Sequence, residues 1–213
     1  KHLIATETSK LLGDENNALV VIGGGLDSLA LQQSAASSRQ KIVELDHPST
    51  QQVKKTVLKS YATDASALQL AEFDASKDSL HEVLACLDSA SIKQGVFICE
   101  GVLMYLPEEK VRNLLEQVAT AAPKVTLIFT FMDQSHHGSW HFAEATMAAR
   151  AWLRLVGEPF MWGCPKSELG SFLSECGLQL VDILDTRDWR VRGDSEHGLP
   201  VASGEYLAIA KSH

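Results

Sequence analysis

The chain has 213 residues, of which 45% are hydrophobic and 22% charged, and its formal net charge is −8. This length and composition fit one soluble globular domain that buries a substantial core. The acidic charge argues against nucleic acid as a partner, because phosphate binding needs clustered Lys and Arg. No apolar run approaches the ~20 residues that cross a bilayer, so we expect no membrane partner either.

Seven short apolar runs are typical of the strands of a parallel sheet that helices cover on both faces. We expect these strands at Ala18–Ile22, Lys41–Leu45, Leu68–Phe73, Gly95–Cys99, Val125–Phe131, Leu178–Leu184 and Tyr206–Ala210. Helical patterns lie between them, at Asp27–Ser37, Gln51–Ala62, Ser79–Asp88, Pro107–Ala121, Trp140–Val156 and Lys166–Cys176.

This alternation predicts an α/β fold with a doubly wound, seven-stranded sheet, because strand–helix–strand connections cross over with one hand. Residues 185–205 are polar and show no helical pattern, so we expect the last strand to run antiparallel beside its neighbour. One domain, residues 1–213, accounts for the whole pattern. Because the chain begins with Lys1 and not Met, we expect part of its N-terminal region to be missing.

The four cysteines, Cys86, Cys99, Cys164 and Cys176, are widely scattered and form no CxxC pair. Such spacing is typical of neither a zinc site nor a dense disulfide framework. We therefore expect free thiols and a cytoplasmic protein.

Three consecutive glycines, Gly23, Gly24 and Gly25, follow the first expected strand in the segment VVIGGGLDS. Ligands of open α/β sheets bind at the carboxyl ends of the strands, and glycine lets a ligand approach the backbone closely. No Gly-Lys-Ser/Thr follows, which excludes a Walker A loop, and Ser28 replaces the third glycine of the dinucleotide fingerprint. The glycines alone leave open NAD, S-adenosylmethionine or a tight turn without a ligand.

Acidic residues end the next three expected strands. Glu44 and Asp46 lie about 20 residues beyond the glycines, where an acid accepts hydrogen bonds from the ribose of either cofactor. Asp74 could receive an adenine amino group or cap a helix. Glu100 follows the fourth strand, and a carboxylate there suits the ammonium group of a methionine moiety, whereas a nicotinamide ring offers no cation for it. The alternative roles of Glu100 are a helix N-cap or a structural bond to the glycine loop.

The segments VVIGGGLDS, VELDHP, EFDASKDSL, CEGVLMYLPEE and GEPFMWG together resemble the leucine carboxyl methyltransferase family of class I S-adenosylmethionine-dependent enzymes, and especially its bacterial members, such as polyketide O-methyltransferases. The resemblance runs from about residue 18 to residue 185. It implies a Rossmann-like methyltransferase sheet and S-adenosyl-L-methionine as the cofactor. By position it implies a cofactor site made of Gly23, Gly24, Gly25, Asp46, Asp74, Ala75 and Glu100.

The same resemblance implies that Tyr105 lies at the mouth of a substrate pocket. His136, in QSHHGSWHFAE, and Trp162, in GEPFMWG, are further substrate-side candidates. His136 could act as a general base, and Trp162 could pack in the core or form an apolar wall over the methyl donor. We expect residues 134–166 to form this substrate-side or lid segment.

A metal site is a weaker interpretation of the same histidine-rich segment. His137 and His141 have the i,i+4 spacing of metal ligands on a helix. Gly138 and Ser139 lie between them and indicate a loop, so we expect no metal.

We therefore expect an S-adenosylmethionine-dependent O-methyltransferase that acts on a carboxylate or hydroxyl of a small molecule or peptide terminus. A carboxylate acceptor is already nucleophilic at neutral pH, so no catalytic residue is predicted. One alternative is an NAD(P)-dependent oxidoreductase, supported by the glycines with Glu44 and Asp46. The other is a non-catalytic methyltransferase-fold binding protein, because LDSLALQQ lacks the Arg that the family usually carries there. The oligomeric state is not predicted.

Overall fold

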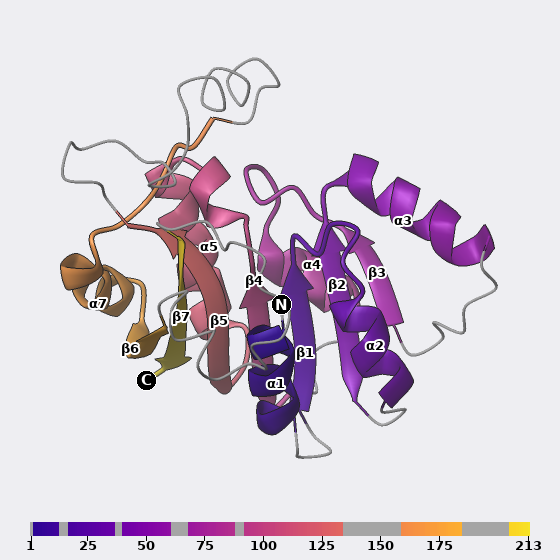
Figure 1. Ribbon diagram of the computed structural model, residues 1–213, viewed down its shortest axis with the longest axis horizontal. Coiled ribbons are helices and arrows are strands. Elements are labelled where there is room, and N and C mark those ends of the chain that lie inside the picture. Colours follow the sequence, from indigo (N-terminus) through magenta and orange to yellow (C-terminus); the bar gives the residue numbers. More distant parts are fainter. Residues whose placement is uncertain are drawn as a thin grey trace, which may run out of the picture.

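The computed structural model of the protein describes residues 2–12, 17–36, 40–60, 68–87, 92–133, 159–184 and 205–213. Figure 1 labels the α-helices and strands within these ranges. In chain order they are α1 (His2–Leu11), β1 (Asn17–Ile22), α2 (Leu29–Ala36), β2 (Lys41–Asp46), α3 (Pro48–Ser60), β3 (Leu68–Glu72), α4 (Leu80–Cys86), β4 (Gln94–Cys99), the 3₁₀ turn η2 (Leu103–Tyr105), α5 (Glu108–Thr120), β5 (Lys124–Met132), α7 (Lys166–Glu175), β6 (Leu178–Leu184) and β7 (Glu205–Ser212).

The strands form one seven-stranded sheet in the order β3-β2-β1-β4-β5-β7-β6. Parallel pairs join β3 to β2, β2 to β1, β1 to β4 and β4 to β5. The last strand, β7, lies antiparallel between β5 and β6, which confirms the predicted direction of this strand. The strand order reverses at β1, and ligands of such sheets bind outside the carboxyl ends of the strands at that point.

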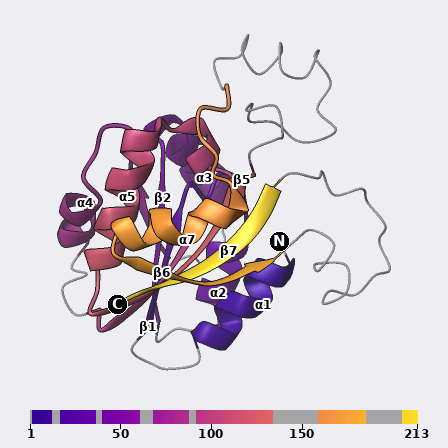
Figure 2. The same cartoon turned by 90° about the vertical axis from the view of Figure 1, so that its left-hand side faces the viewer.

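Helices cover both faces of the sheet because alternate side chains of each strand point to opposite faces. Val20 and Ile22 of β1 belong to the core that packs against α4, α5 and α7. Leu19 and Val21 belong to a second core, which packs against α1 and α2. Figure 2 shows the two helical layers on opposite sides of the sheet. The fold is therefore the doubly wound α/β arrangement that the sequence predicted.

Helix α5 illustrates how the sequence pattern becomes packing. Val111, Leu114, Leu115 and Val118 are all buried against the sheet, as their spacing along one helical face requires. Burial of each such side chain contributes about 1.5–3 kcal/mol to folding. Pro107 precedes the helix, and Glu108 and Glu109 stand in its first turn, where negative charge favours the helix dipole.

Several expectations lie outside the described residues. These are the helix at Trp140–Val156, the polar connection at 185–204, and most of the expected substrate-side segment, including His136, His137 and His141. Within the described ranges, no helix is both long and apolar enough to span a membrane.

Candidate functional site

Two adjoining cavities open at the carboxyl edge of the sheet, where β1, β2, β3 and β4 end. The larger, of about 470 Å³, is lined by six predicted site residues, namely Gly23, Gly25, Asp46, Asp74, Ala75 and Tyr105. The smaller, of about 340 Å³, is lined by Glu100 together with Asp27, Ser28 and Gln32. The two cavities are adjacent, because consecutive residues line different ones. Gly25 and Gly101 line the larger cavity, whereas Leu26 and Glu100 line the smaller one. The structure thus brings most of the predicted site residues together at the carboxyl edge of the sheet.

The glycine loop after β1 packs closely against its neighbours in the fold. Gly23 has a φ of +70°, and a Cβ there would lie 2.1 Å from Cγ2 of Val102. A Cβ on Gly24 would lie 2.5 Å from Cδ of Glu44. The backbone N–H of Gly23 donates to the carbonyl of Leu45 at 2.8 Å, which fixes the loop against β2. Of the three glycines, Gly24 is buried and lines neither cavity.

The two acids of β2 have different environments. Asp46 is half-buried, lines the larger cavity and accepts hydrogen bonds from the backbone N–H groups of Gly25 and His47. Each carboxylate oxygen has two lone pairs, so both oxygens can still accept a ligand hydroxyl. Glu44 lies two residues earlier, is 1% exposed and is paired with Lys54. The structure therefore distinguishes two acids that the sequence left as alternatives.

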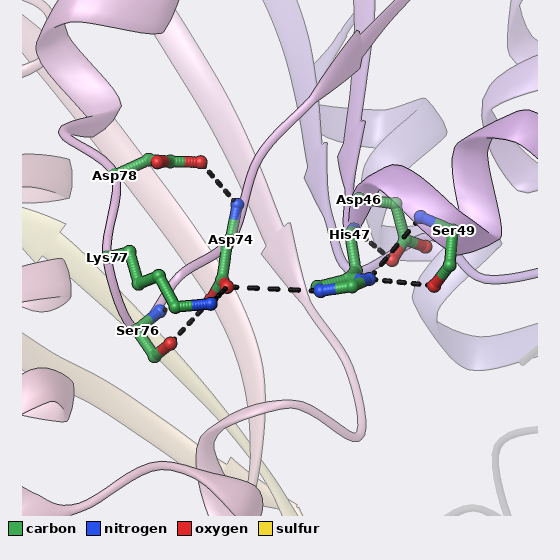
Figure 3. A network of polar contacts seen from close by, with 7 residues as sticks. All are labelled: Asp46, His47, Ser49, Asp74, Ser76, Lys77 and Asp78. Carbon is green, nitrogen blue, oxygen red and sulfur yellow. Dashed lines mark hydrogen bonds and ion pairs between the residues drawn. The ribbon is translucent and has the colours of Figure 1, made fainter.

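Asp74 lies in a network of polar contacts beside the larger cavity (Figure 3). Its Oδ2 accepts from the Lys77 ammonium at 2.6 Å, and its Oδ1 accepts from the Ser76 backbone N–H and hydroxyl at 3.0 and 2.5 Å. These donors, chiefly Lys77, lower the pKa of Asp74 to about 2. The N-cap of α4 is Ser79, so Asp74 stabilises the turn before that helix and does not cap it.

His47 is a cavity residue that the sequence analysis did not single out. Its Nδ1 lies 2.7 Å from the Ser49 hydroxyl, and its Nε2 lies 3.9 Å from Oδ2 of Asp74 (Figure 3). The ring therefore stands between the ends of β2 and β3. Its place directly after Asp46, in VELDHP, was the available sequence signal.

The smaller cavity is acidic. Glu100 directly follows β4 and is half-buried. Asp27 lines the same cavity, and its Oδ1 accepts from the backbone N–H of Leu29 at 2.6 Å. Ser28 and Gln32 line it as well, and the Gln32 amide donates to the Ser28 hydroxyl at 2.8 Å. The described residues that line this cavity include no Lys or Arg. Two carboxylates beside neutral donors favour a cationic group.

The two substrate-side aromatic residues lie in different places. Tyr105, in η2, lines the larger cavity, and its ring centroid lies 5.6 Å from that of Phe160. Trp162 is 2% exposed, and its ring centroid lies 5.4 Å from that of Phe172. The structure thus places Trp162 in the hydrophobic core, which is the packing alternative of the sequence analysis. The backbone N–H of Met161 donates to the Met104 carbonyl at 2.7 Å and holds this segment against η2.

All four cysteines are free, as expected from their spacing, and three of them are buried. In the part of the chain that the structure describes, no three His, Cys, Asp or Glu side chains gather into a group that could hold a metal ion.

The fold is shared with solved structures of several methyltransferases. Similar solved structures include the pyocyanin biosynthetic protein PhzM, at 16% identity and a TM-score of 0.57, which covers 100% of this chain and 55% of that one. Mitomycin 7-O-methyltransferase MmcR has 16% identity and a TM-score of 0.54, over 99% of this chain and 54% of its own. The N,N-8-amino-8-demethyl-D-riboflavin dimethyltransferase RosA of Streptomyces davawensis has 14% identity and a TM-score of 0.55, over 98% of this chain and 56% of its own.

The family follows from the sequence match. The leucine carboxyl methyltransferase family model matches residues 5–119, more than half of the chain. The YktD protein of Bacillus subtilis (strain 168), whose assignment as an S-adenosyl-L-methionine-dependent methyltransferase is itself provisional, is 26% identical over 176 residues, 79% of this chain and 56% of that protein. The chain belongs to the leucine carboxyl methyltransferase family, whose cofactor is S-adenosyl-L-methionine. It spans about half the length of these relatives.

Proposed function

We propose that the protein is an S-adenosyl-L-methionine-dependent O-methyltransferase whose cofactor lies across both cavities. The observation that carries this proposal is the distribution of the acids around the glycine loop. Asp46 and Asp74 line the larger cavity, whereas Glu100 lines the smaller one. An adenosine in the larger cavity and a methionine moiety in the smaller one would match each acid with a donor group. Both volumes fall in the range of small-molecule sites.

On the adenosine side, Asp46 would accept hydrogen bonds from the two ribose hydroxyls. Its two oxygens each hold one backbone N–H already, which fixes the orientation of the carboxylate before the ligand arrives. Asp74 would accept from the adenine amino group beside Ala75, and its low pKa keeps it ionised at neutral pH. Gly23 and Gly25 leave room for the ligand at the loop.

On the methionine side, Glu100 would pair with the cofactor's α-ammonium group. A half-buried carboxylate beside a cavity favours a cationic ligand there, because an opposite charge nearby stabilises its ionised form. Asp27 lines the same cavity and adds negative charge, while Ser28 and Gln32 supply neutral donors for a carboxylate.

The reaction would then depend on alignment and on exclusion of water. When bound, the cofactor supplies a methyl group that is already activated on a sulfonium. The protein's own part is to hold the acceptor oxygen in line with that methyl group, and Tyr105 with Phe160 would form an apolar wall on this side. A carboxylate of a small molecule or peptide terminus needs no base, whereas a hydroxyl acceptor would need one.

The names of similar proteins support the class more strongly than the acceptor atom. The family name and the name of MmcR favour an oxygen acceptor, but the compound in the name of RosA carries an amino group. The test is a screen of carboxylate and hydroxyl compounds with S-adenosylmethionine labelled in its methyl group. We expect an oxygen acceptor to gain one labelled methyl. Cofactor binding without transfer would favour the non-catalytic binding protein, and hydride transfer to NAD(P) would favour the oxidoreductase.

A further inference from the structure

An ion pair lies buried directly under the glycine loop. The Lys54 Nζ of α3 lies 2.6 and 2.7 Å from the two carboxylate oxygens of Glu44 in β2. The two side chains are only 6% and 1% exposed. Removing two charges from water is costly, and a buried ion pair is weak evidence for stability. The pair therefore calls for an explanation other than stability alone.

The pair touches the glycine loop at two points. Lys54 Nζ also donates a hydrogen bond, at 2.5 Å, to the backbone carbonyl of Asp27, where the loop enters α2. The Glu44 carboxylate lies against Gly24, so closely that a Cβ on Gly24 would lie 2.9 Å from its Oε1. The loop thus rests on Glu44 at its middle and on Lys54 at its end.

A third buried side chain, that of Gln51, holds α3 against the sheet beside the ion pair. Gln51 lies one helical turn before Lys54 on α3 and is fully buried. Its side-chain amide donates to the carbonyls of Glu44 and Ala71 at 3.0 and 3.1 Å, which joins α3 to β2 and β3. Burial raises the pKa of Glu44, and the Lys54 ammonium opposes that rise by its hydrogen bond and charge.

We propose that Lys54 is a positioning residue that, through Glu44 and the Asp27 carbonyl, holds the glycine loop in the conformation that receives the cofactor. Gly25 on one side of the loop lines the larger cavity, and Asp27 on the other lines the smaller one. A shift of the loop would therefore disturb both halves of the site at once. The role rests on the proposed function only in that the loop's ligand is taken to be S-adenosylmethionine.

The test begins with Lys54→Met, which keeps the length of the side chain and removes its charge. The matched control is Lys55→Met, because Lys55 is the next residue and makes only a surface contact, at 3.4 Å, with Glu72. Lys54→Met is expected to weaken S-adenosylhomocysteine binding about tenfold or more, because the loop is no longer preorganised. It is also expected to speed amide hydrogen exchange at residues 23–27 of the ligand-free protein, while Lys55→Met changes neither.

A double variant, Glu44→Gln with Lys54→Met, separates positioning from stability. Removing both charges of a buried pair is often neutral for folding, so we expect its melting temperature to exceed that of Lys54→Met. The donor to the Asp27 carbonyl is still missing, so fast exchange at the loop and weak binding should persist. Should Lys54→Met fail to fold, this variant carries the test alone.

Two results would overturn the proposal. One is loop exchange in the double variant as slow as in the wild type, and the other is wild-type affinity for S-adenosylhomocysteine in that variant. If the wild-type protein itself binds no S-adenosylhomocysteine, the proposed function fails. The exchange measurement on the ligand-free protein would then still decide whether Lys54 positions the loop.

Discussion

At the scale of single residues, the acids at the carboxyl edge differ by their partners. Glu44 is buried and faces Lys54, whereas Asp46 receives two backbone N–H groups and still faces a cavity. Asp74 is held by Lys77 and Ser76 beside the same cavity. Because each carboxylate has its own donors, substitutions of Glu44, Asp46 and Asp74 should differ in their effects on stability and on ligand binding.

The lowered pKa of Asp74 predicts a specific dependence of stability on pH. Lys77 and Ser76 lower this pKa from 3.8 to about 2, so the folded state favours the ionised form. This contribution is present above about pH 4 and is lost as the pH falls towards 2. Urea unfolding of the wild type and of Asp74→Asn should therefore show a stability difference at pH 6 that shrinks below pH 4. A difference that stays constant from pH 6 to pH 2 would contradict the ion-pair account.

At the scale of elements, one side chain links two helices on the same face of the sheet. Gln117 of α5 accepts with its Oε1 from the backbone N–H of Leu80 at 2.7 Å and from the Ser79 hydroxyl at 3.2 Å. It thereby satisfies a donor at the start of α4, which the helix itself leaves without a partner.

Gln117→Ala should lower the free energy of unfolding by about 1 kcal/mol, because the Leu80 N–H loses its acceptor. The neighbouring exposed residue offers the control, and Glu116→Ala should change stability by no more than about 0.5 kcal/mol. Urea denaturation measures both. Equal effects of the two substitutions would show that the contact between α4 and α5 contributes nothing of its own.

The strands could be predicted from the sequence more closely than helix α1 at the N-terminus. Strand β6, Leu178–Leu184, has its predicted bounds, and the other strands differ from theirs by at most two residues at either end, since buried apolar runs define them directly. Helix α1 was not predicted. The buried face of this segment consists of Ile4, Thr8 and Leu12, and the polar Thr8 interrupts the apolar pattern that would indicate a helix. Thr8 is buried, and its hydroxyl donates to the Ile4 carbonyl at 2.6 Å, so a polar residue occupies a core position.

The candidate site was predictable to a similar degree. Strand ends could be located from the apolar runs, so the acids that follow them could be assigned to one edge. The separate environments of Glu44 and Asp46 depend on Lys54, a side chain from the following helix, and no local pattern encodes that contact. The burial of Trp162 likewise depends on Phe172 of α7, which only the folded chain brings beside it.

At the scale of the whole molecule, the buried cysteines report on the integrity of the core. Burial raises the pKa of Cys99 and Cys164 to about 12 and that of Cys176 to about 11, whereas Cys86 is exposed. Because thiolates are the reactive form, iodoacetamide should modify Cys86 alone in the native protein and all four cysteines in denaturant. Peptide mass spectrometry identifies the modified sites. Native labelling of Cys99 at the rate of Cys86 would mean that the sheet opens readily.

The central claim is that one S-adenosyl ligand spans both cavities, and calorimetric titration with S-adenosylhomocysteine tests it most directly. We predict that the wild-type protein binds S-adenosylhomocysteine and does not bind NAD. Asp46→Ala should weaken binding by roughly 1.5–3 kcal/mol, because two charge-assisted hydrogen bonds are lost. Glu100→Gln should weaken it while leaving the melting temperature nearly unchanged, and Asp182→Ala, an exposed acid of β6, should have no effect. Binding of NAD in place of S-adenosylhomocysteine, or wild-type affinity in both site variants, would contradict the claim.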